Sequence, residues 1–422
     1  MRKRWACLIL FALLSSSSAA EKSLFDSTAL SGEWGGFRSP DSGVTLKLGY
    51  TQEILGVVAG GIRRHADYDA LASIDLKLDL EKLVGWRGAT FRAAGFGIIG
   101  SSLSSESIGS DCNVSNINYR NSVRLYECYL DQTLLDGRLS FRVGELAVDS
   151  EFFGSEIGDV PGGGLFFNSD FGALPIVSFN APCAIYAIAA PGLRIKVAPT
   201  DSSYIQMGVY DGNPAPDLLG DPSPGFQPGR HYNDHGLDIH LASSEGAFVI
   251  GEAGFTTKRW PGSYKLGAFY HTDDFTRWRD GSAVSGIWAA YAIAGQKLWN
   301  EKPADAQGLY FFARGSMAPQ NRARLEWAGD AGFDYVGAIP GRDQDILGIG
   351  FSVKNYSRDF SAAQQRAGQS AVEVESVLEL TYQIEVAPCI TVQPDLQYVI
   401  QPGGHVAASN AVVLGLRVST LF

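Results

Sequence analysis

The carboxy-terminal segment, Ala411 to Phe422, constrains the fold of this chain most strongly. Its even-numbered positions form a mainly apolar series that ends in Phe422, and the positions between them include Arg417 and Ser419. A period of two with one apolar face is typical of a β-strand. Bacterial outer-membrane barrels commonly end in such a strand, because the last strand closes the sheet. The tail therefore predicts an exported barrel whose outer surface contacts lipid.

The amino-terminal segment predicts the export. A basic head, Arg2 to Arg4, precedes an apolar run from Trp5 to Leu14, and four serines and two alanines follow it. This is the pattern of a secretory signal peptide. The run is too short to cross a bilayer, which takes about 20 apolar residues. We therefore expect a cleaved signal peptide over residues 1–20 and an outer-membrane barrel over residues 21–422.

Alternation recurs along the chain, clearly over residues 72–80, 372–386 and 390–400. A soluble antiparallel sandwich would also alternate. A membrane barrel is favoured because the alternating runs reach the 9–11 residues, approximately, that a tilted strand needs to cross a bilayer. With about 25 residues for each strand and its connection, the chain length predicts about 16 strands, as in porins. We predict an all-β fold, a transmembrane antiparallel β-barrel.

Two segments interrupt this rhythm. Residues 149–190 are rich in Gly and Phe, and residues 211–233 hold five prolines. Long loops in compact domains tend to be functional. We predict that both segments are long extracellular loops and that one of them folds into the lumen.

Composition and spacing argue against several other functions. The formal net charge of −11 disfavours nucleic-acid binding. Because the periplasm is oxidising, disulfides are possible, and Cys112 with Cys128 is the expected pair. His231, His235 and His240 do not have the spacing of a zinc motif. We expect no catalytic residue, no metal and no cofactor.

Several blocks of the chain resemble the carbohydrate-selective porins of the OprB type. In chain order they are SGEWGGFR (31–38), LDLEKLVGWRGATF (78–91), LYECYLDQTLLDGRLSFRVG (125–144), GLFFNSDFG (164–172), AAPGLRI (189–195), GVYDGNP (208–214), PGSYKLGAFY (261–270), VGAIPGRDQDILGIGF (336–351) and TVQPDLQYVIQPGG (391–404). The resemblance implies a sixteen-stranded, monomeric barrel in the outer membrane of a Gram-negative bacterium, narrowed by inward loops. It implies passage of glucose-like sugars or polyols. This chain has Glu145 after Gly144, where that family often has a basic residue.

Strand parity selects the side chains that we expect to line the narrow zone of the lumen. Sugars cross such a zone by exchanging water for hydrogen bonds, which arginines donate and carboxylates accept. The predicted set comprises the strand residues Arg92, Glu127, Arg142 and Arg194, together with the loop residues Glu145, Asp149, Glu151 and Asn168. The same parity places Tyr126 and Cys128 on the outer face. Phe152, Phe166 and Phe167 are expected to anchor a loop rather than to stack on sugars.

Two alternatives remain open from the sequence. A barrel of this shape could carry another small solute, such as an organic anion attracted by the arginines. It could also be a structural barrel without a transport role. The partners expected for the preferred reading are a small sugar and outer-membrane lipid.

Overall fold

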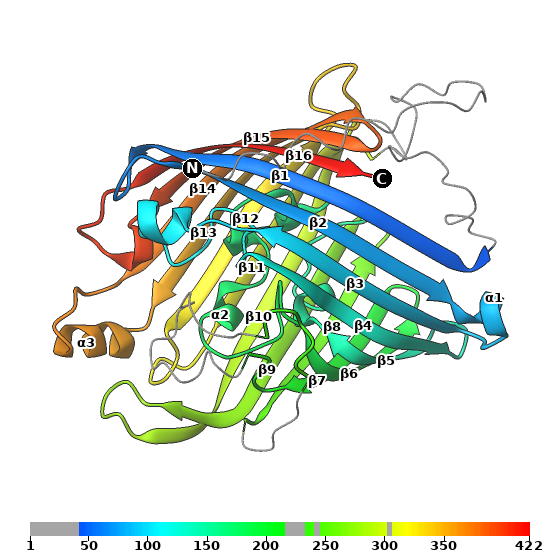
Figure 1. The fold of residues 1–422 in the computed structure, drawn as a ribbon, viewed down its shortest axis with the longest axis horizontal. Helices are drawn as coiled ribbons and strands as arrows, with labels where there is room; N and C mark the ends of the chain where they lie inside the picture. The colour runs from blue at the N-terminus through cyan, green and yellow to red at the C-terminus, as the bar shows by residue number, and fades with distance from the viewer. Residues whose placement is uncertain (1–41, 216–232, 240–244, 302–305) are drawn as a thin grey trace, which may run out of the picture.

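The chain folds into a closed antiparallel barrel of sixteen strands in the part that a computed structural model describes, which is residues 42–215, 233–239, 245–301 and 306–422 (Figure 1). The predicted signal peptide over residues 1–20 lies outside the described residues. The strands are β1 (Val44–Gly60), β2 (Ala66–Asp79), β3 (Ala89–Ile99), β4 (Ser122–Leu134), β5 (Leu139–Leu146), β6 (Ala190–Thr200), β7 (Ser203–Asp211), β8 (Ala247–Thr257), β9 (Gly262–Thr276), β10 (Ala283–Asn300), β11 (Gly308–Met317), β12 (Leu325–Val336), β13 (Ile346–Tyr356), β14 (Val374–Ala387), β15 (Ile390–Ile400) and β16 (Ala411–Leu421).

Each strand pairs with its neighbours in the chain, and β1 pairs with β16 to close the sheet. In that closing pair Glu53 stands opposite Arg417, and their side chains form an ion pair of 2.6 Å. The alternating segments of the sequence lie on β2, β14, β15 and β16. The predicted all-β barrel of about 16 strands is therefore confirmed.

Burial is inverted relative to a soluble protein. On β14, Leu378 and Leu380 are 42% and 43% exposed, whereas the intervening Glu379 is 0% exposed. The same contrast holds on β16, where Leu416 is exposed and Arg417 is buried. Because a membrane barrel presents its apolar face to lipid and its polar face to the lumen, this pattern is the one expected of a membrane-spanning barrel.

The two ends of the barrel differ. At one end, short connections join β4 to β5, β6 to β7 and β14 to β15. The start of β1 and the end of β16 lie at this same end of the barrel. Longer connections occupy the other end, which is the extracellular end by the rule that outer-membrane barrels place their longer loops outside. Figure 1 shows α1 (Leu80–Val84) and α3 (Arg358–Arg366) at opposite ends. Within the described ranges, no helix is both long and apolar enough to span a bilayer.

Short helical turns lie in the loops. They are η3 (Leu103–Ile108), η4 (Val148–Ser150), η5 (Gly162–Leu165), η6 (Ser169–Phe171), α2 (Pro175–Ser178) and η8 (Pro402–Gly404). Four of these turns, from η4 to α2, belong to the connection between β5 and β6, residues 147–189, which we call the inner loop.

The inner loop crosses the lumen. It leaves the wall beside β4 and β5, and its residues 165–172 contact the wall at β11 and β13–β15, far around the barrel. There Glu379 accepts hydrogen bonds from the backbone N–H groups of Phe167 and Asn168. The ammonium of Lys354 lies 2.7 Å from the carboxylate of Asp170, and both side chains are fully buried. The prediction that one long loop enters the lumen is therefore confirmed.

The phenylalanines of the inner loop are core residues. Phe152, Phe166 and Phe167 are at most 1% exposed. The ring of Phe166 packs against Phe171 at 4.6 Å and against Phe312 of β11 at 5.6 Å between centroids. This confirms the expectation that these rings anchor the loop.

The expected Cys112–Cys128 disulfide is wrong. Cys112, Cys128, Cys183 and Cys389 are all free thiols. Cys112 follows Ser110, whose hydroxyl bonds Glu375 on β14, whereas Cys128 lies on β4. The loop that joins β3 to β4 crosses to the far wall before it returns, so proximity along the chain does not bring the two sulfurs together.

Candidate solute constriction

The first part of the site joins β2, β3 and β4. The guanidinium of Arg92 forms ion pairs of 2.6 Å with Asp75 and of 2.6 Å with Glu127. Glu127 also accepts hydrogen bonds from the backbone N–H of Ala147, at 3.1 Å, and from the hydroxyl of Ser150, at 2.7 Å. Glu127 therefore ties a wall arginine to the start of the inner loop.

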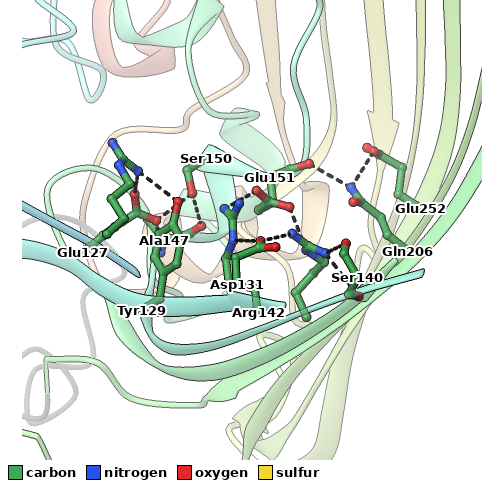
Figure 2. Close-up of polar contacts among 12 residues, drawn as sticks. Glu127, Tyr129, Asp131, Ser140, Arg142, Ala147, Ser150, Glu151, Gln206 and Glu252 are labelled. Atoms are coloured by element: carbon green, nitrogen blue, oxygen red, sulfur yellow. Dashed lines mark hydrogen bonds and ion pairs between the residues drawn. The ribbon is translucent and has the colours of Figure 1, made fainter. Parts of the chain in front are cut away.

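The second part joins β4, β5 and β6 to the inner loop. Asp131 accepts hydrogen bonds from Arg142 Nε, at 2.9 Å, and from Arg194 Nη2, at 3.1 Å. Glu151 pairs with both arginines from the loop side, and its Oε2 lies 2.8 Å from Arg194 Nε. Two arginines and two carboxylates thus alternate in one group. Figure 2 shows this group within a longer row of polar side chains that runs from Glu127 to Glu252 of β8.

An aromatic ring separates the two parts. Tyr129 of β4 lies below the guanidinium of Arg142, with 4.1 Å from Cζ to the ring centroid, and 5.8 Å from that of Arg92. Attraction between a cation and the face of a ring contributes about 0.5–2 kcal/mol, depending on exposure. The ring therefore helps to hold both arginines against the wall. We name the group Asp75, Arg92, Glu127, Tyr129, Asp131, Arg142, Glu151 and Arg194 the constriction cluster.

A hydrogen-bonded extension continues along the wall. Gln206 of β7 donates from Nε2 to the backbone carbonyl of Glu151, at 2.8 Å, and to Glu252, at 3.1 Å. The hydroxyls of Tyr204 and Tyr291 also donate to Glu252, at 2.6 and 2.8 Å. The carboxylate of Glu252 is thereby saturated by neutral donors.

Asp149 lies in the turn η4 of the inner loop, directly before Ser150. Its Oδ2 accepts a hydrogen bond of 2.9 Å from the backbone N–H of Tyr186. Burial raises the pKa of this carboxyl to about 6, and the charge of Glu127 adds to the rise. Asp149 therefore titrates within two pH units of neutrality, next to the constriction cluster but not in it.

The structure brings five of the eight predicted residues together, namely Arg92, Glu127, Arg142, Glu151 and Arg194. Glu145 is not one of them, and it is not a loop residue, since β5 extends to Leu146. It stands opposite Cys128 of β4 and Pro191 of β6, and no hydrogen bond or ion pair among the described residues joins its side chain to the five. Asn168 lies on the opposite wall, where its side-chain amide donates to Gln397 at 3.0 Å. Glu145 and Asn168 therefore lie outside this group, and their role in the narrow zone stays a prediction.

Sequence reasoning missed Asp75, Tyr129 and Asp131, although parity could have found all three. Asp75 is on the polar face of the 72–80 alternation, and Asp131 follows Tyr129 by two positions on β4. The outward placement of Tyr126 was wrong. The pairing of β3 with β4 shifts register at Ala94/Gly95, and Tyr126 packs inside against Phe96, at 4.4 Å between centroids. A β-bulge places two successive residues on one side, which simple parity cannot anticipate.

The histidine group noted in the sequence is not assembled as a site by the described residues. His235 bonds the backbone carbonyl of Val123, and His231 and His240 lie outside the described residues. Over the described ranges, no group of three or more His, Cys, Asp or Glu is placed to hold a metal ion.

The family described as "Carbohydrate-selective porin, OprB family" matches residues 63–422. The chain belongs to this family. It is an outer-membrane porin of the carbohydrate-selective class, as the resemblance of its sequence blocks implied.

Relatives and solved structures agree with this placement. Porin B of Pseudomonas aeruginosa is 25% identical over 467 aligned positions, covering 97% of this chain and 94% of the relative. The putative porin QuiX of Acinetobacter baylyi is 23% identical and covers 93% of each chain. The high-pH structure of Pseudomonas putida OprB superposes with a TM-score of 0.83 at 24% identity, covering 95% of this chain and 100% of that chain. The last likeness establishes the fold.

Proposed function

We propose that this porin conducts neutral monosaccharides or related polyols through the constriction cluster. One observation carries the proposal: every arginine of the cluster is paired with carboxylates, and donors and acceptors still face the lumen. Paired charges produce a weak net field, so that ions gain little there. The groups can still exchange hydrogen bonds with hydroxyls that pass, which is what selective permeation needs.

The charge count disfavours the organic-anion alternative. The cluster holds three arginines and four carboxylates, Asp75, Glu127, Asp131 and Glu151. Its formal charge is therefore negative by one, and an anion meets slight repulsion. A purely structural barrel is disfavoured by membership in a porin family. The proposal is passive diffusion and assigns no catalytic residue.

Liposome swelling tests the proposal. Glucose, mannitol and a monocarboxylate of similar size are compared in vesicles that contain the porin. We expect the two neutral polyols to enter faster than the anion, and R142A or R194A to weaken the saturation of glucose flux without closing the pore. The matched control is R87A, because the Arg87 side chain is 86% exposed in the turn after α1. Rates that depend on solute size alone, or unchanged saturation in both lumen variants, would contradict the assignment.

Two further expectations belong to this proposal. We propose that residues 1–20 are removed on export, so that intact mass measurement of the purified porin should show a chain that starts at Glu21. We also propose that each barrel acts as a monomer in contact with outer-membrane lipid. Light scattering in detergent should give the mass of one chain, and a trimer mass would overturn this point.

A further inference from the structure

A large hollow lies on the extracellular side of the inner loop. Its volume is about 1260 Å³, which exceeds the 300–1,000 Å³, approximately, of common ligand pockets. Its walls are the β3–β4 loop, residues 172–188 of the inner loop, the end of β9 and two arginines that follow β11. We call this hollow the vestibule.

The lining of the vestibule combines aromatic rings with polar groups. Tyr126 and Tyr186 stand on one wall, and Phe179 and Trp278 stand on another. Flat apolar faces of this kind cover the C–H side of a sugar ring, and amides and carboxylates bind its hydroxyls.

Some polar groups of the vestibule have unused bonding capacity. Oδ1 of Asp149 and the hydroxyl of Ser115 are buried without a hydrogen-bond partner among the described residues. Within the same ranges, the half-buried side-chain amide of Asn113 and the exposed carboxylate of Asp274 also make no hydrogen bond to protein groups, although their backbone N–H groups do. Buried polar groups without partners are costly, so Asp149 and Ser115 favour a polar occupant. The side chains of Asn113 and Asp274 are accessible and can bind its hydroxyls.

The charge of the vestibule selects against anions. Its lining has five aspartates, including Asp111 and Asp149, and three arginines, Arg120, Arg322 and Arg324. A neutral, hydroxyl-rich occupant therefore fits better than a carboxylate or a phosphate.

One turn of the chain connects the vestibule to the constriction. Asp149 and Ser150 line the vestibule, and the hydroxyl of Ser150 also donates to Glu127 of the constriction cluster. A molecule held in the vestibule thus lies next to the entrance of the narrow zone.

We propose that the vestibule is a second carbohydrate-binding site, which holds a saccharide of two or more rings outside the constriction. The inference rests on the proposed function, because it assumes that sugars are the cargo. The vestibule raises the local sugar concentration at the entrance, and its size admits chains longer than the single ring that the constriction cluster would contact.

Trp278 supplies a built-in reporter. Its indole N–H donates to the carbonyl of Ala323 at 2.9 Å, and its ring meets Phe360 edge-on, at 4.9 Å between centroids. The other tryptophans in the described ranges, Trp86, Trp260, Trp288, Trp299 and Trp327, are at least 41% exposed, and none lines the vestibule. A fluorescence change on sugar binding that W278F abolishes therefore reports the vestibule.

The test titrates the purified porin in detergent with maltotriose, maltose and glucose, by tryptophan fluorescence and by calorimetry. We expect saturable binding that is tightest for maltotriose. W278F should lose the optical signal and keep the heat, and N113A/D274A should bind about fivefold more weakly, which corresponds to the loss of one or two net hydrogen bonds. R87A, in the exposed turn after α1, should bind as the parent does. Heat-modifiable migration in gels, if retained, shows that a variant is folded. If N113A/D274A does not fold, the single variant D274A replaces it in the titration.

Two outcomes would overturn the inference. The first is that maltotriose produces neither binding heat nor a change in fluorescence. The second is that the parent and N113A/D274A bind maltotriose with equal affinity. Liposome swelling separates this failure from that of the proposed function. Selective glucose uptake without vestibule binding refutes only the vestibule. Vestibule binding without selective uptake refutes only the constriction.

Discussion

Replacing Asp131 with asparagine should move the ion preference of the pore toward anions. Asp131 accepts hydrogen bonds from Arg142 and Arg194, and its side chain is 15% exposed. Asparagine keeps the shape and one acceptor oxygen but removes the charge. The formal charge of the constriction cluster then changes from minus one to zero, while both arginines keep Glu151 as a partner.

The magnitude follows from Coulomb's law. A unit charge about 4 Å from a passing ion contributes about 1 kcal/mol in bulk water and about 4 kcal/mol at an effective dielectric constant of 20. Because the lumen holds water, we take the lower value, which corresponds to about a fivefold change for each ion. Chloride and potassium respond in opposite directions, so the ratio of chloride to potassium permeability should change by about 30-fold. The effect should shrink in 1 M salt, where the screening length falls from about 10 Å to about 3 Å. Glucose is neutral, and its flux should change less than twofold.

The assay is the reversal potential of single pores under a KCl gradient near 0.1 M. D136N is the matched control, because Asp136 is 96% exposed in the turn between β4 and β5. An unchanged reversal potential in D131N, with folded protein and normal conductance, would refute the view that the cluster sets the field of the pore.

Two further predictions concern the inner loop. K354M should lower the unfolding temperature and enlarge the single-pore conductance relative to K258M, a variant at an exposed lysine. The reason is that K354M leaves the buried carboxylates of Asp170 and Glu375 without their cation, at a cost of about 3–5 kcal/mol. Equal conductance in the two variants would show that this anchor of the inner loop does not control the lumen. For Asp149, the raised pKa of about 6 means that the folded state binds the proton more tightly, so its contribution to stability is complete below pH 4 and is lost as pH rises through 6. Against D149N, the parent should lose about 3 kcal/mol over that interval, and a pH-independent difference in thermal unfolding between the two would contradict this reading.

Local pattern predicted much of this molecule because the rule that governs it is local. Alternation determines which side of a strand faces lipid, so Arg92, Arg142 and Arg194 could be placed in the lumen from parity alone. Their partner Asp131 obeys the same rule and could have been included. Parity failed at Tyr126, where a shift of register within the β3–β4 pair turns two adjacent side chains inward.

Loop residues were less predictable because their positions depend on contacts with distant strands. Glu151 joins the arginines, but Asn168, from the same loop, lies against β14 and β15. The sequence predicted that a long loop enters the lumen, but the residues between these two do not indicate where the chain crosses to the opposite wall. The crossing depends on Lys354, Glu379 and the ring of Phe312, which occur far later in the sequence.

The amino-acid sequence by itself determined that this chain forms a membrane barrel and which side chains its regular strands turn inward, because these properties follow from alternation with a period of two. The approximate number of strands followed from the chain length. The tertiary structure alone decided which charges neutralise one another, where the inner loop is anchored and how large a vestibule remains above it. Those properties require residues separated by up to hundreds of positions to meet, and they depend on the closure of the sheet and the path of a loop, neither of which local periodicity describes.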